Sequence, residues 1–114
     1  MTKRLFILTL AIGLTLSFSG IAFASDFAGT GEIVELGCYK SQNATGEGHA
    51  ACAKKCLSGG KAMGLLLEDG SIVELAKGDE TVYESAIELA GKQAKVTGSK
   101  ADGKVTIASV AAAS

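Results

Sequence analysis

The chain has 114 residues, an aromatic fraction of 5%, no tryptophan and a formal net charge of −1. A nucleic-acid-binding protein normally needs a basic face with interleaved aromatic side chains, so this composition excludes nucleic acid as a partner. The length suffices for one small domain, and domains of this size often need a disulfide or a metal ion to support a modest core.

Residues 1–24 have the three parts of an export signal in the right order. Lys3 and Arg4 form a basic start, an uncharged apolar run follows, and a small-x-small cleavage site ends at Ala24. An uncleaved membrane anchor is the alternative, but polar residues interrupt the apolar run. We therefore expect a signal peptide that is removed, leaving residues 25–114 as a single periplasmic or secreted domain without a membrane span. Cleavage removes two of the 11 basic residues and none of the 12 acidic ones, so the mature chain has a formal charge of −3.

The first element expected after the signal is a strand over residues 30–36, TGEIVEL. Side chains alternate along a strand with a period of two, so Val34, Leu36 and Cys38 should share one face. Cys38 is therefore expected to point inward at the end of this strand. A polar, glycine-containing loop over residues 41–48 should follow it.

A short helix is predicted from His49 to Ser58. The segment is rich in good helix formers, and Gly59 and Gly60 stop it. This helix carries the only histidine of the chain and two of its three cysteines, in the spacing H-x2-C-x3-C.

Two hairpins with a helix between them complete the chain. Asp-Gly is a strong hairpin signal, and it joins residues 63–67 to 71–75 and residues 92–97 to 104–110. Thr81-x-x-Glu84 looks like a capping box that opens the intervening helix, which Gly91 should close. Its apolar positions should face the core, at Tyr83, Ala86, Ile87 and Ala90.

This order of elements indicates the fold class. Five short strands with a helix between the third and the fourth are the order of an OB-type barrel. We therefore expect an α+β, mainly β fold, an OB-like five-stranded small barrel in which the Cys/His-bearing helix is inserted after the first strand.

The candidate site consists of Cys38, His49, Cys52 and Cys56, and a soft metal ion is the ligand it favours. Three cysteines and one histidine form a well-attested tetrahedral zinc set, and thiolates also suit Cu(I). One difficulty concerns His49 and Cys56, because seven residues of helix rise about 10.5 Å. Four-ligand binding therefore needs a helix that begins after His49.

Two alternatives use the same residues. Positions four apart on a helix have Cβ atoms about 5–6 Å apart, which makes Cys52–Cys56 a poor disulfide. A Cys38–Cys56 disulfide would instead staple a structural or interaction module and leave Cys52 free. His49, one turn earlier, could then lower the pKa of Cys52 and make it redox-active. No oxyanion hole or orienting third residue is evident, so no catalytic residue is assigned and a binding or structural module is favoured over an enzyme.

Several of these motifs also carry a resemblance. Cys38-Tyr39 is followed by the pattern H-x2-C-A-x2-C, which starts at His49, and by the turn Glu68-Asp69-Gly70. With the pattern A-G-K-x-x-x-V-T-G that starts at Ala90, the stretch from Gly31 to Ala111 resembles a family of small exported bacterial proteins of unassigned function. One departure is Ala62, where that family tends to have proline. The resemblance implies an OB-like fold and a shared Cys/His group, and it implies no reaction.

Overall fold

The computed structural model describes residues 25–113, so the expected signal peptide lies outside the described residues. In chain order the elements are β1 (Ser25–Glu35), α1 (Leu36–Gln42), the 3-10 turn η2 (Glu47–His49), α2 (Ala50–Ser58), β2 (Met63–Leu67), β3 (Ile72–Ala76), α3 (Glu80–Glu88), β4 (Gln93–Ala101) and β5 (Lys104–Ala112). The expected α+β, mainly β class is confirmed. Within the described part of the chain, no helix is long and apolar enough to cross a membrane.

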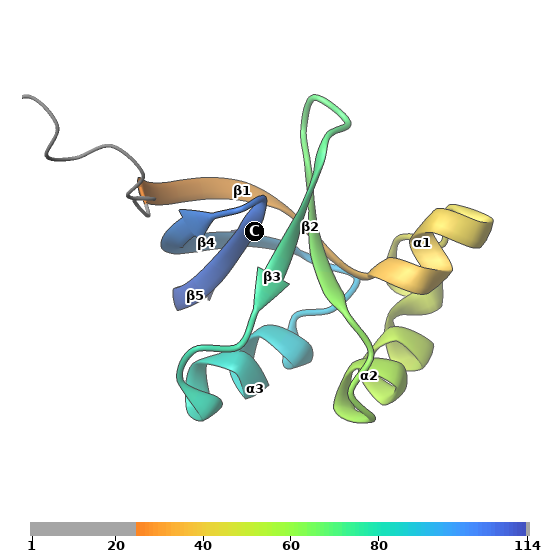
Figure 1. The fold of residues 1–114 in the computed structure, drawn as a ribbon. Helices are drawn as coiled ribbons and strands as arrows, with labels where there is room; N and C mark the ends of the chain where they lie inside the picture. The colour runs from red at the N-terminus through yellow and green to blue at the C-terminus, as the bar shows by residue number, and fades with distance from the viewer. Residues whose placement is uncertain (1–24, 114) are drawn as a thin grey trace, which may run out of the picture.

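The five strands form one sheet that closes into a ring in the order β1-β2-β3-β5-β4 (Figure 1). Neighbouring strands are antiparallel except β3 and β5, which run parallel. β1 closes the ring because it is long: residues 31–35 pair with β2, and residues 25–32 pair with β4. Its far end leads directly into α1, which lies with α2 to one side of the strands (Figure 1).

The core is built from all five strands together with α2 and α3. Its members are buried apolar residues. The largest of those entirely shielded from solvent include Ile33, Met63, Leu65, Val96 and Val105. Helix α1 contributes nothing to this main cluster, since its buried Leu36 packs outside it. The ring and the first helix are therefore stabilised by different contacts.

Both expected hairpins are confirmed, and their turns differ. Between β4 and β5, Asp102 (φ 54°) and Gly103 (φ 80°) both adopt the left-handed conformation that a tight two-residue turn requires. The β2–β3 loop has four residues, and the Asp69 carboxylate accepts hydrogen bonds from the backbone N–H (2.9 Å) and hydroxyl (2.6 Å) of Ser71. That extra length starts β3 at Ile72, one residue later than expected.

Helix α3 begins earlier than its expected capping box, and the assignment of Thr81 as the cap is wrong. Asp79 has extended backbone angles, and its carboxylate accepts from the N–H groups of Thr81 (2.9 Å) and Val82 (3.1 Å). Asp79 therefore takes the capping role that was expected of Thr81. The apolar face is confirmed, because Ala86 and Ile87 are buried.

The first strand differs most from expectation. It begins at Ser25, five residues before the expected start, and ends at Glu35. The expectation that Cys38 points inward at its end is wrong, because Cys38 lies in α1 and is half-exposed. Glu35 caps this seven-residue helix, and Asn43 ends it in the left-handed conformation (φ 55°). Local capping therefore overrides the period-two pattern here.

Candidate metal and thiol site

Residues 36–62, hereafter the insert, connect β1 to β2 and carry all the candidate ligands. Helix α2 is attached to the core through Ala53 and Leu57, each 2% exposed. Helix α1 is attached through Leu36, whose N–H donates to the carbonyl of Ala62 (2.9 Å). The Leu36 side chain also lies over Gly64 of β2, where a Cβ atom would come within 2.6 Å of it. Both helices are thus held against the ring by a few apolar contacts.

Two further contacts fix the segment before α2. The Glu32 carboxylate, on β1, accepts a hydrogen bond from the N–H of Gly46. Gly91, in the α3–β4 connection, lies directly against this segment. A Cβ atom at position 91 would be 2.8 Å from Ala50 Cβ and 2.9 Å from the carbonyl oxygen of Gly46. The insert is therefore pressed onto the ring at the residues that precede Cys52.

Glu35 is a candidate site residue that the sequence analysis did not identify. The residue is 4% exposed, and it is the one buried charged residue within residues 25–113. Oε2 accepts from the N–H of Gly37 (2.7 Å) and Oε1 from the N–H of Cys38 (3.1 Å). Its burial could have been inferred from strand alternation, which places Glu35 on the same face as the core residue Ile33.

The Cys38 thiol is held in its protonated form. Its pKa is raised to about 11, first by a hydrogen bond to the Glu35 carboxylate, then by burial, and then by the negative charges of Glu35, Cys56 and Cys52. The two thiols that act on Cys38 both belong to α2. Cys38 and Cys56 are half-buried, whereas Cys52 is exposed.

Glu35 itself remains ionised at neutral pH. Burial acts to raise its pKa, but hydrogen bonds from the Cys38 thiol and from the N–H groups of Gly37 and Cys38, together with the charge of Lys61, lower it below the usual value. A buried negative charge, that of Glu35, therefore lies next to the Cys38 thiol.

His49 ends the 3-10 turn, and α2 begins at the next residue. Its N–H donates to the carbonyl of Gly46 (3.0 Å). Its Nε2 atom is buried and has no hydrogen-bond partner within the described residues. Buried polar atoms are nearly always paired, so this ring nitrogen needs an explanation.

The four expected ligands all lie in the insert, but their side chains do not form a metal site. Cys38, Cys52 and Cys56 are all free thiols. Across residues 25–113, no three His, Cys, Asp or Glu side chains are grouped closely enough to hold a metal ion. The groups available for chemistry in the insert and at its junction with β1 are three free thiols, a buried carboxylate and an imidazole nitrogen without a hydrogen-bond partner.

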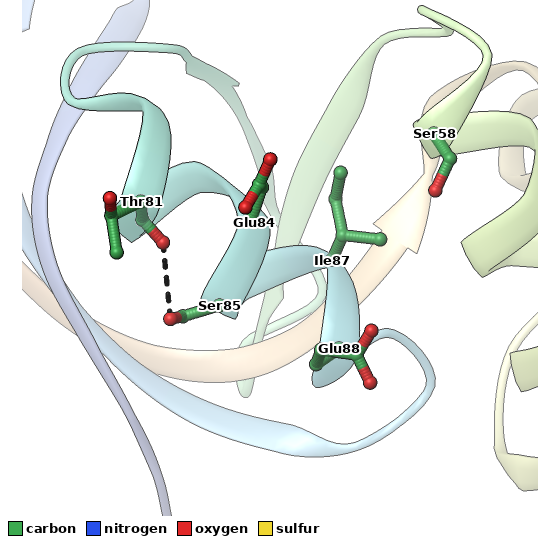
Figure 2. A pocket seen from close by; sticks show the side chains of 6 residues that line it. All are labelled: Ser58, Thr81, Glu84, Ser85, Ile87 and Glu88. Carbon is green, nitrogen blue, oxygen red and sulfur yellow. Dashed lines mark hydrogen bonds between the residues drawn. The ribbon is translucent and has the colours of Figure 1, made fainter.

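A pocket of about 390 Å³ lies between α3 and the end of α2, and it contains none of these groups (Figure 2). Its walls combine polar and apolar surface, and two of the polar groups already have partners: the Ser85 hydroxyl donates to the carbonyl of Thr81 (3.1 Å), and Glu88 pairs with Lys54 (3.8 Å). The other lining residues are Ser58, Glu84 and Ile87 (Figure 2). With no cysteine or histidine in it, this pocket is separate from the thiol chemistry.

Comparison of the chain with family models, with curated proteins and with solved structures finds no match.

Proposed function

We propose that the chain is an exported small domain that binds one soft metal ion, Zn(II) or Cu(I), through the insert. The thiolates of Cys38, Cys52 and Cys56 are the principal ligands, with His49 as the fourth. The observation that carries this proposal is that Cys52 and Cys56, both on α2, raise the pKa of Cys38 on α1, so that thiols from two helices act on one sulfur. Thiolate sulfur is a preferred ligand of both metals, with Zn–S distances of about 2.3 Å.

Electrostatics support a cation at this position. Three groups that are negative or become negative on deprotonation raise the pKa of Cys38, namely Glu35, Cys56 and Cys52. The same charges that hold a proton on this sulfur would attract a metal ion in its place. Metal binding would accordingly release protons from the thiols.

The buried Nε2 atom of His49 supports its role as the fourth ligand. A neutral imidazole nitrogen without a partner can donate a lone pair to a metal, and three thiolates with one imidazole complete a tetrahedron. His49 also lies in the 3-10 turn just before α2, and a four-ligand set requires such an irregular entry to the helix. Loading requires the side chains to rotate inward, because their present arrangement forms no ligand set.

We also infer an OB-like barrel as the scaffold. The ring order β1-β2-β3-β5-β4, with β3 parallel to β5, supports this assignment, as does the position of α3 between β3 and β4. On this scaffold, the insert occupies the connection between the first two strands.

One observation favours a second candidate, a Cys38–Cys56 disulfide beside a free Cys52. The charge of Cys56 raises the pKa of Cys38 more than the charge of Cys52 does, so Cys56 is the better-placed partner. Cys52 is also the most exposed of the three, as expected for a thiol that is left over. This chain would be a stapled structural or redox module.

One experiment separates the two candidates. The protein is purified without reductant, and its intact mass, bound metal and reactive thiols are measured. The metal proposal expects one metal ion per chain and three reactive thiols after chelation and denaturation. Substituting serine for Cys38, Cys52 or Cys56 should weaken loading, whereas Ser58→Ala, at the end of the same α2 helix, should not. A chain lighter by two hydrogens, with no metal and one thiol, would reject the metal proposal and support the disulfide.

A further inference from the structure

We propose that Glu35 is the positioning residue of this site: its carboxylate fixes the main chain of Cys38 on the first turn of α1. The inference rests on the proposed function in that it names what holds one of the ligands. Metal ligands commonly depend on such outer partners, whose loss typically costs about 10–100-fold in metal affinity.

Glu35 connects the ring to the insert. Its backbone belongs to β1, where it pairs with Met63 of β2. Its two carboxylate oxygens accept from the N–H groups of Gly37 and Cys38, which belong to the insert. The orientation of the Cys38 main chain is thereby set by a strand whose position the ring determines.

Gly37 provides an independent indication that this arrangement is specific. A Cβ atom at that position would lie 3.0 Å from Oε2 of Glu35, closer than an ordinary van der Waals contact. Glycine therefore leaves the carboxylate room to reach both N–H groups. A Cβ atom at position 37 would require the carboxylate to shift by a few tenths of an ångström.

The length of α1 makes this contact decisive. Isolated helices shorter than about 12–15 residues are marginal in water, and α1 has seven residues. Its only buried residue is Leu36, so packing alone does not define the orientation of Cys38. The Glu35 cap and the Leu36 anchor must together hold the turn that carries the ligand.

The test compares Glu35→Gln with Glu35→Asp, and uses Glu47→Gln as a control on an exposed carboxylate of the insert. Glutamine places an amide donor opposite a backbone donor, whereas aspartate is itself a good helix cap. In the metal-free protein, amide hydrogen exchange at Gly37 and Cys38 should be faster in Glu35→Gln and near wild type in the other two. In Co(II) titrations, the thiolate-to-metal absorption should need about 10–100-fold more metal in Glu35→Gln only.

Gly37→Ala is a second variant in case Glu35→Gln does not fold. It keeps the carboxylate but crowds Oε2, and a smaller loss of protection and affinity is expected. Unchanged exchange at both amides in Glu35→Gln and in Gly37→Ala would overturn the positioning role whether or not metal binds. Failure of the wild-type chain to bind Co(II) would instead refute the proposed function, and the exchange data would still decide the role of Glu35.

Discussion

The ring of strands and the insert are held in place by different kinds of contact. The ring encloses a continuous apolar cluster, to which every strand contributes. The insert adds only Ala53 and Leu57 to that cluster. It is otherwise held by Leu36 over Gly64 and by polar or close contacts at Glu32, Glu35 and Gly91. Most of the apolar core that stabilises the domain therefore belongs to the ring, whereas the cysteines and the histidine belong to the insert.

This division has a physical consequence for the site. The buried charge and the unpaired imidazole nitrogen, each costly in an apolar environment, both belong to the insert or to its junction with β1. A small domain tolerates such groups where a stable scaffold offsets their cost. Perturbing the ring should therefore affect folding, and perturbing the insert should affect the thiols.

The largest effect is expected from the ring. Leu65→Ala removes a completely buried side chain of β2 and should lower the free energy of unfolding by about 2–5 kcal/mol. Leu66→Ala, at the next position of the same strand, is the matched control, because Leu66 is only partly buried. Urea denaturation measures both. Equal losses would mean that the ring has no distinct interior.

The Cys38 thiol should be unusually unreactive. With a pKa of about 11 instead of 9.0, its thiolate fraction at pH 8 is reduced by about 100-fold, and alkylation should slow accordingly. The rate should rise about tenfold per pH unit up to that pKa, since only the thiolate reacts. Peptide mapping after timed maleimide labelling of metal-free protein measures it, with urea-denatured chain as the control. A native rate equal to the denatured one would remove the Glu35–Cys38 interaction from the account.

The contact between ring and insert can be isolated with two glycines. Gly91 (φ 82°) and Gly70 (φ 92°) share a left-handed backbone, but only Gly91 has neighbours where a Cβ would be placed. Gly70→Ala should cost about 1 kcal/mol in backbone strain, and Gly91→Ala about 1–3 kcal/mol more from crowding. Urea denaturation compares them. Equal costs would show that the insert does not press on the ring.

The smallest effect concerns the cap of α3. Asp79→Ala should lower the free energy of unfolding by about 1 kcal/mol, since two N–H groups lose their acceptor. Thr81→Ala, at the position expected from sequence to be the cap, should cost less than half of that. The reverse order in thermal or urea denaturation would restore Thr81 as the cap.

These comparisons also indicate how far sequence alone could lead. The hairpins were predictable because Asp-Gly acts locally, as Asp102 and Gly103 illustrate. The buried face of α3 followed from helical spacing. Helix α1 was not predictable, because the apolar, β-branched residues before it favour a strand and the Glu35 cap that starts the helix is not one of the usual capping residues.

The candidate site was predictable in composition but not in arrangement. Cysteine and histidine are rare enough here that their spacing alone marks the insert. The contribution of Glu35 depends on the pairing of β1 with β2, a contact between distant parts of the chain that buries its carboxylate. Local patterns carry no information about such a contact.

The central claim is that three thiolates from two helices bind one metal ion. X-ray absorption at the zinc edge of the Zn(II)-loaded chain tests this claim most directly. We expect three sulfur neighbours at about 2.3 Å and one nitrogen at about 2.0–2.1 Å, with one sulfur lost in Cys38→Ser. A zinc shell made of nitrogen and oxygen alone, or an unchanged shell in Cys38→Ser, would contradict it.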